Sequence, residues 1–451
     1  MLISMLGPGM LSCFLRVLLH LTYFMIFRKG EGFFAMRSGN YSNSGVLNVV
    51  HRPNRLWIPV SGRSGAFEYL PNSPIDYQLL VIVLALGVIG LITVYAATYH
   101  LGLEYLRGQT LRLLMGCGAL WLGMKVNLGR IAGRNFQWLL LIIMLGLLMG
   151  AIVLGNLAGV VARREFHGFQ PQEFVKYALV IWLAGYFERL RNSDSKPNFL
   201  NTVIKPGVIV VLTVGLTLIQ PAVGTSVIIG VSSFLIFVLA GVKWRYLFPL
   251  VMLGVLLTGL CFAIIPKLKN TKFHYIPDRW EKFCAGDRYH QTQALIALGS
   301  GGPFGKGLGE SRQKYYFLPK LHKDFIFCLI GEERGFLGAV ILILLYILLM
   351  YRVTKVAERS VTEFGRLLSS GVGVVITIYA MVHIAVSLSL IPTTGQPLPF
   401  ISYGGSALVS NMFAAGLVLN VSRHRRSGVD EEGVAGRGWN RRPYLPRARA
   451  G

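Results

Sequence analysis

Apolar runs of about 20 residues recur along this chain, and they constrain its fold more than any other feature. A helix of that length crosses a hydrocarbon core about 30 Å thick. Within a bilayer, a helix also satisfies all its own backbone hydrogen bonds. Charged residues make up only 14% of the chain, against roughly 25% in soluble domains. The sequence therefore predicts an all-α integral membrane protein with about ten transmembrane helices. The expected spans lie near residues 77–97, 108–126, 137–157, 173–190, 206–220, 224–241, 246–265, 335–351, 371–391 and 406–421.

Lys and Arg in the short loops indicate how the chain is oriented, because short basic loops stay on the cytoplasmic side. One large polar loop, residues 266–334 between the seventh and eighth helices, then lies on the extracytoplasmic side. The net charge of +25 does not indicate a nucleic-acid partner, because the cations are spread over loops and a tail instead of one basic module. The basic loops that fall on one side are 130–134, 189–205, 243–245, 352–366 and 423–426.

The two ends of the chain differ from the helical region. The N-terminal extension has three interpretations: a signal peptide, an eleventh span that would place Arg16 in lipid, or a mis-assigned start with translation beginning at Met36. The basic tail is expected to be disordered and cytoplasmic. Its cations could be attracted to anionic membrane lipid, but a charge cluster that sets the topology is the favoured interpretation. The predicted regions are the extension (1–75), helices 1–7 (76–265), the large loop (266–334), helices 8–10 (335–422) and the tail (423–451).

A glycine-rich stretch, residues 299–309, lies in the large loop. Repeated glycine lets backbone N–H groups approach an anion, which makes Gly305, Lys306 and Gly307 candidates for contacting a phosphate. The stretch is not a nucleotide P-loop, because Gly307 stands where Ser or Thr should follow the lysine. A tight turn with no ligand explains the glycines equally well.

His322 and Asp324 stand directly before an apolar stretch. A carboxylate at the membrane edge can act as a base, but Asp also caps helices for about 1 kcal/mol, and spacing alone favours the cap. Glu332 and Glu333 follow nearby, where acidic residues more often complement a helix dipole than catalyse.

Two further polar segments lie at membrane boundaries. Glu173 and Lys176 are one helical turn apart and able to pair, either as a structural ion pair or as part of a substrate site. Residues 391–406 contain several Pro and Gly and are expected to form a loop that faces water or protein. The five Cys are scattered without metal-ligand spacing, so the sequence assigns no metal site and no disulfide framework.

Taken together and in order, five segments resemble the SEDS family (shape, elongation, division and sporulation), and details near residues 313–314 and 330–333 favour its division branch. The resemblance implies ten transmembrane helices in the bacterial inner (cytoplasmic) membrane. It implies an inverting glycosyltransferase that polymerises lipid II, in which the 4-hydroxyl of one disaccharide displaces the undecaprenyl pyrophosphate of another. The five segments are 169–176, 220–225, 294–309, 317–333 and 392–406.

The family pattern LPExHTDFIF falls on residues 318–327, so the resemblance implies that Asp324 is the base that activates the acceptor. Lipid II and a class B penicillin-binding transpeptidase are the expected partners, with other division or elongation proteins. A divalent cation at the pyrophosphate is an open expectation. Rival interpretations are a lipid II flippase, which would use the Glu173 and Lys176 charges, and a scaffold without chemistry, which Ala222 and Lys323 in place of family residues would explain. The residues expected to bind substrate are Lys306, Gly305, Gly307, His322, Glu173, Lys176, Gln293, Ser402 and Glu333.

Overall fold

The computed structural model describes residues 74–157, 169–193, 198–220, 222–249, 252, 289–314 and 321–424. These residues form helices and loops, with no β-strand among them. The interpretations of the N-terminal extension, of the first part of the large loop and of the tail beyond residue 424 lie outside the described residues. The elements are α4 (Tyr77–Thr98), η2 (Tyr99–Leu101), α5 (Leu103–Lys125), α6 (Leu128–Ala132), α7 (Arg134–Leu157), α8 (Pro171–Asn192), η3 (Leu200–Ile204), α9 (Lys205–Ile219), α10 (Val223–Leu239), α13 (Tyr289–Ser300), α14 (Leu321–Asp324), α15 (Ile326–Arg359), α16 (Glu363–Ser387) and α17 (Gly405–Ser422).

Nine of the ten predicted spans coincide with helices in the part of the chain that the structure describes. Six helical segments there are long and apolar enough to cross a membrane. They involve α4, α7, η3 with α9, α15, α16 and α17. The predicted span 246–265 is described only at residues 246–249 and 252, so ten spans stay a prediction. The all-helical membrane architecture itself is confirmed.

The helix that contains the eighth predicted span begins before that span. The large loop was expected to continue to residue 334, but α15 already begins at Ile326 and continues through a kink at Gly335 (φ 67°, ψ −164°). The kink lies at the residue where the span was predicted to start, so the boundary between the large loop and the eighth span stays a prediction. Glu332 and Glu333, which precede the kink, are buried inside the fold.

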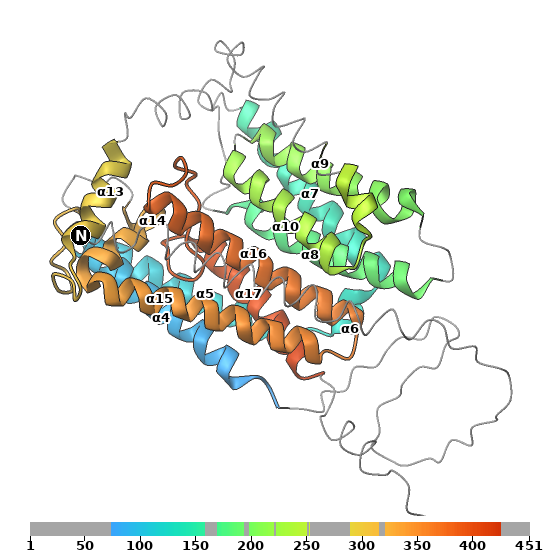
Figure 1. Cartoon of the computed structure of the whole chain (residues 1–451), viewed down its shortest axis with the longest axis horizontal. Coiled ribbons are helices and arrows are strands. Elements are labelled where there is room, and N and C mark those ends of the chain that lie inside the picture. The colour runs from blue at the N-terminus through green and yellow to red at the C-terminus, as the bar shows by residue number, and fades with distance from the viewer. Residues whose placement is uncertain are drawn as a thin grey trace, which may run out of the picture.

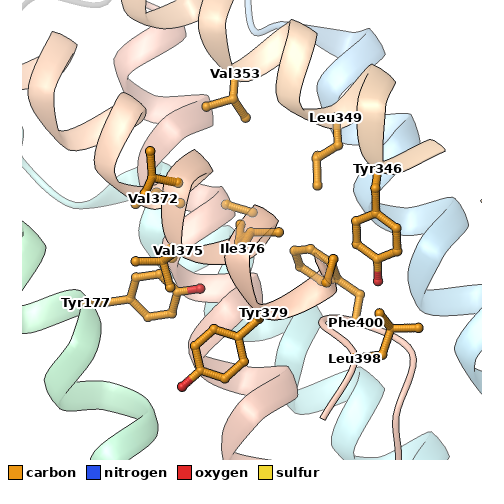
Figure 2. Packing of buried hydrophobic residues seen from close by; sticks show 14 of the residues in the cluster. Tyr177, Tyr346, Leu349, Val353, Val372, Val375, Ile376, Tyr379, Leu398 and Phe400 are labelled. Atoms are coloured by element: carbon orange, nitrogen blue, oxygen red, sulfur yellow. The ribbon is translucent and has the colours of Figure 1, made fainter. Parts of the chain in front are cut away.

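The helices gather in two groups that meet along α16. Figure 1 shows α7, α8, α9 and α10 side by side, with α4, α5, α15 and α17 on the other side of α16. Apolar side chains of α16 fill the space between Tyr177 on α8 and Tyr346 on α15 (Figure 2). The Tyr346 hydroxyl donates to the backbone oxygen of Pro399 at 2.5 Å, which ties the loop before α17 to this core.

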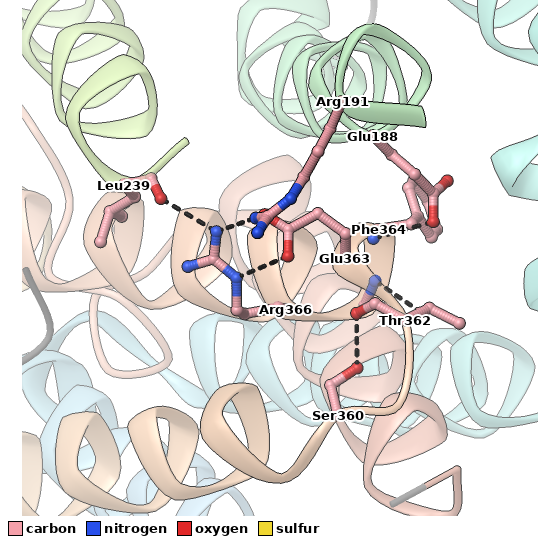
Figure 3. A network of polar contacts seen from close by, with 9 residues as sticks. Glu188, Arg191, Leu239, Ser360, Thr362, Glu363, Phe364 and Arg366 are labelled. Atoms are coloured by element: carbon pink, nitrogen blue, oxygen red, sulfur yellow. Dashed lines mark hydrogen bonds and ion pairs between the residues drawn. The ribbon is translucent and has the colours of Figure 1, made fainter. Parts of the chain in front are cut away.

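Polar contacts join α8, α10 and α16 at the end of the bundle far from α14 (Figure 3). Arg191 donates to Glu363 at 2.9 Å, and Arg366 donates both to Glu363 and to the backbone oxygen of Leu239, the latter at 3.0 Å. These partly buried ion pairs hold three helix ends in register.

Helices α5 and α17 pack backbone against backbone, because glycines stand at their contact. A Cβ atom added at Gly416 would lie 2.3 Å from the Leu120 backbone oxygen, and one added at Gly123 would lie 2.6 Å from the Phe413 oxygen. Small residues of this kind are what allow close packing of membrane helices.

We therefore expect Gly416→Ala to destabilise the protein by about 1–3 kcal/mol, the usual cost of overpacking a tight contact. Thermal unfolding in detergent measures the change. Gly118→Ala, on the same helix pair, is the matched control because a Cβ there meets no atom within 4 Å. Equal stability of the two variants would contradict the close packing.

Candidate functional site

Asp324 lies at the end of the short helix α14, and Phe325 separates it from α15. Phe325 is the N-cap residue of α15, and its own side chain forms no capping hydrogen bond. Asp324 precedes this cap position by one residue, so its two interpretations, a helix cap and a base, both stay predictions. The side chain of Asp324 is partly buried and keeps access to solvent.

The loop before α17 holds α14 in place through backbone contacts. The Tyr403 N–H donates to the His322 oxygen at 3.0 Å, and the Ser402 hydroxyl donates to the Lys323 oxygen at 2.8 Å. Ser402 also accepts from the Leu398 N–H at 2.8 Å. The Ser402 hydroxyl, predicted to bind substrate, is thus occupied in fixing Lys323, the residue before Asp324.

An aromatic and cationic cluster surrounds this junction. The rings of Tyr105, His322 and Tyr403 pack on one another with centroids 5.4–5.5 Å apart. The Arg112 guanidinium lies 4.1 Å from the Tyr403 ring centroid, and the Lys323 ammonium lies 5.9 Å from it. We call these five residues the aromatic–cation cluster. It brings α5, α14 and the loop before α17 together beside Asp324.

Arg112 was missed by the sequence reasoning. It lies inside helix α5, more than two turns from the start at Leu103, and its Nη1 is buried without a hydrogen-bond partner among the described residues. An arginine inside an apolar helix is costly, and such residues usually serve an ion or a substrate. The lone Arg within the predicted span 108–126 was the available signal.

Glu173 and Lys176 form the predicted ion pair in the first turns of α8. Their charged atoms are 2.5 Å apart, and each side chain is only 2% exposed. The Lys176 ammonium lies 3.9 Å from the centroid of the Tyr379 ring, and Tyr177 donates to Asn411 at 2.6 Å. The pair is closed and buried, which is the geometry of a structural ion pair.

The loop before α17 also joins the other polar segments. Gln396 bonds to Thr225 at 3.2 Å through its amide nitrogen, and its backbone oxygen lies 2.9 Å from Nδ1 of His383. The Gln170 N–H donates to the Ser406 hydroxyl at 2.9 Å. Segments 169–176, 220–225 and 317–333 therefore all meet at segment 392–406.

The glycine-rich stretch does not form an anion cradle. The N–H groups of Gly305, Lys306 and Gly307 bond to the backbone oxygens of Gly301, Glu332 and Glu333, respectively. The Lys306 ammonium bonds to Ser300 at 2.7 Å and to Glu332 at 2.8 Å. The geometry thus favours a structural turn over the predicted phosphate contact at Gly305, Lys306 and Gly307.

Two other predicted substrate residues have mainly structural surroundings. Glu333 is 3% exposed, and its backbone oxygen accepts from Gly307. Gln293 is partly buried on α13, but the amide that contacts the rest of the site belongs to its neighbour Gln291, which donates to the Ile391 oxygen at 2.9 Å.

Comparison with known proteins decides the family. A model of the FtsW/RodA/SpoVE family, described as a cell cycle protein, matches residues 76–427. The chain belongs to this family. The match begins at Asp76, the residue that caps α4 and pairs with Arg352 at 2.6 Å. It covers the whole helical region of this FtsW/RodA/SpoVE member.

Alignments with two named relatives extend over nearly the full length of those relatives. A probable peptidoglycan glycosyltransferase FtsW of Trichlorobacter lovleyi is 32% identical over 400 residues, which are 84% of this chain and 96% of the relative. Stage V sporulation protein E of Bacillus subtilis is 33% identical over 366 residues, 78% of this chain and 98% of the relative. This FtsW/RodA/SpoVE chain is therefore similar both to a probable peptidoglycan glycosyltransferase and to a sporulation protein.

Solved structures share the fold. RodA of Thermus thermophilus aligns with a TM-score of 0.56 at 27% identity, covering 78% of this chain and 98% of RodA. A chain from a structure on the coordination of polymerization and crosslinking by a peptidoglycan synthase complex aligns with a TM-score of 0.62 at 26% identity. That alignment covers 77% of this chain and 98% of the other. This FtsW/RodA/SpoVE member is thus a multi-pass membrane protein of RodA-like fold.

Proposed function

We propose that this chain is a peptidoglycan glycosyltransferase that polymerises lipid II during cell division. The observation that carries the proposal is that Asp324, a partly exposed carboxylate, directly follows His322 and Lys323 of the aromatic–cation cluster in the chain. Glycosyl transfer from a lipid diphosphate uses a base, flat rings that hold a sugar and cations that hold a phosphate. Arg112 and Lys323 form no ion pair with any carboxylate among the described residues. The FtsW relative, described as a probable peptidoglycan glycosyltransferase, supports the substrate.

The proposed reaction inverts the anomeric carbon of the donor. Asp324 accepts the proton of the acceptor 4-hydroxyl, whose oxygen forms a bond to the anomeric carbon as the bond to the pyrophosphate oxygen breaks. The electron pair of the broken bond leaves with the undecaprenyl pyrophosphate. Arg112 and Lys323 then offset its negative charge in a site of low dielectric constant, where such charges interact strongly.

One role assigned from sequence changes in this proposal. Arg112 replaces Lys306 as the cation for the leaving group, because Lys306 already pairs with Glu332. A divalent cation stays a proposal too. No three His, Cys, Asp or Glu side chains gather as a metal site in the described ranges. Mg²⁺ nevertheless often takes one carboxylate and substrate phosphates, and no proposed step depends on it.

The proposed setting is the bacterial inner membrane, with the Asp324 end of the bundle outside the cytoplasm. A class B penicillin-binding transpeptidase is the proposed partner, supported by the solved synthase complex that coordinates polymerization with crosslinking. The basic side chains at the opposite end, among them Arg191 and Arg366, agree with a cytoplasmic location for that end.

The rival function is a lipid II flippase, which the buried charges of Glu173 and Lys176 would favour. Proteoliposomes that contain the chain, its transpeptidase and fluorescent lipid II separate the two functions. The transferase proposal expects glycan polymer and no accelerated movement of lipid II between leaflets. Movement without polymer would establish the flippase, and neither product with intact transpeptidase binding would establish a scaffold.

A further inference from the structure

The hydrogen-bond ladder of α15 is interrupted at Gly335 and completed by another part of the chain. In a continuous helix the N–H groups of Phe336 and Leu337 would donate to the oxygens of Glu332 and Glu333. They instead donate to Gly302 at 2.9 Å and Pro303 at 3.1 Å. The two helix oxygens accept from the N–H groups at positions 306 and 307, each at 3.0 Å. These four bonds join residues 302–307 to α15, and we call this segment the splice.

Glycines make the splice sterically feasible. Gly335 adopts a backbone conformation that is essentially restricted to glycine. A Cβ atom there would lie 2.3 Å from the Gly305 nitrogen. A Cβ at Gly305 would lie 2.1 Å from the Glu333 oxygen, and one at Gly301 would lie 2.0 Å from the Gly331 oxygen. The two backbones therefore touch without side chains between them.

The Glu332 carboxylate locks the splice onto α15. It is fully buried and accepts from the Lys306 ammonium at 2.8 Å, the Ser311 hydroxyl at 2.5 Å and the Arg312 N–H at 3.1 Å. Charge-assisted bonds of this kind are stronger than neutral ones. Lys306 is the only one of these three donors that is positively charged. We therefore expect it to contribute most of the stabilisation of the splice.

The first half of α15, residues 326–334, links the splice to the proposed base. It begins directly after Phe325, one residue beyond Asp324, and nearly all its side chains are buried. Its second half is fixed elsewhere, through Tyr346 on Pro399. A rigid half-helix of this length transmits the bend at Gly335 to Asp324, which lies just beyond its other end.

We propose that the splice is a positioning element for Asp324. It keeps α15 bent at Gly335, and the bend places the carboxylate beside the aromatic–cation cluster. When the splice is released, α15 regains its own ladder across Gly335 as a continuous helix, and Asp324 is displaced from the cluster. This inference rests on the proposed role of Asp324.

Lys306→Met tests the lock. We expect kcat for lipid II polymerisation to fall by about 10²-fold, the cost of misplacing a catalytic group by about 1 Å, with KM unchanged. Lys306→Arg should restore most of the rate because it keeps the cation. Arg312→Met is the matched control, because it removes an exposed cation of the same segment and keeps the backbone N–H that bonds Glu332.

Amide hydrogen exchange reports the splice without any turnover, so it separates this inference from the proposed function. In Lys306→Met the amides of Lys306 and Gly307 should lose protection, whereas those of Phe336 and Leu337 should stay protected by the continuous helix. In Gly305→Ala the added methyl group would collide with the Glu333 oxygen and separate the splice from α15. This variant should show the same loss of protection at 306–307 and the same retained protection at 336–337.

Three results would overturn the inference. The first is protection lost at 306–307 with an unchanged kcat, because the splice would then not position the base. The second is protection lost at Phe336 and Leu337 as well, because the helix would then not close. The third is full protection of 306–307 in both variants.

Discussion

An Asp324→Asn variant is expected to polymerise lipid II about 10² to 10⁴-fold more slowly than the wild type, the usual contribution of a positioned base. Asparagine has nearly the same shape as aspartate but cannot accept the proton of the acceptor hydroxyl. Binding of lipid II should be retained, because Arg112 and the rings of Tyr105 and Tyr403 are unchanged. Initial rates of glycan formation and a separate lipid II binding assay measure the two effects.

The matched control for that variant is Glu310→Gln. Glu310 is an exposed carboxylate of the glycine-rich region, so its loss removes the same charge without touching the aromatic–cation cluster. Its rate should equal that of the wild type. If Asp324→Asn polymerised lipid II as fast as this control, Asp324 would not be the base.

A Lys176→Met variant is expected to lose about 3–5 kcal/mol of stability, because removing one partner of a buried ion pair leaves the other charge uncompensated. Glu173 would be that charge, with its side chain only 2% exposed. The double variant Glu173→Gln/Lys176→Met should recover most of the loss, since no unpaired charge stays in the core. Thermal unfolding in detergent compares the three proteins.

Lys243→Met controls for the substitution itself, because Lys243 is exposed and forms no ion pair with a carboxylate in the part of the chain that the structure describes. It should unfold near the wild-type temperature. A functional role for the pair makes a different prediction: the double variant would be stable and still unable to handle lipid II. That outcome would contradict a purely structural ion pair and favour a substrate role.

Local sequence patterns predicted those features of the fold that depend on neighbours in the chain. Apolar runs located the helices, and the one-turn spacing of Glu173 and Lys176 predicted their ion pair. Hydropathy could not indicate that α15 begins before the predicted span, because it averages charges without knowing their partners. Glu332 lowers the average, yet Lys306 and Ser311 neutralise and bond it inside the fold.

The candidate site depended on contacts between distant segments, which one sequence cannot supply. Arg112 and Tyr403 are far apart in the chain and meet only because α5 and α17 pack closely through Gly123 and Gly416. Gln396 reaches Thr225 for a similar reason. The resemblance to a family, and not the spacing, is what directed attention to Asp324.

The glycine-rich stretch shows why a motif alone misleads. Repeated glycines permit close backbone approach to any acceptor, and phosphate is only one candidate. Here the acceptors are the oxygens of Glu332 and Glu333 in α15. The sequence could predict that the N–H groups of the glycine-rich stretch would donate to an acceptor. It could not predict that this acceptor is a backbone oxygen of the same chain.

The most direct test of the proposed function is the product that the wild-type chain makes from lipid II. The chain is purified with its transpeptidase partner, whose own active site is blocked, and the reaction is resolved by glycan length. The account predicts a ladder of glycan polymer that a muramidase cuts back to disaccharide units. Recovery of unpolymerised lipid II, from a folded chain that still binds its partner, would contradict it.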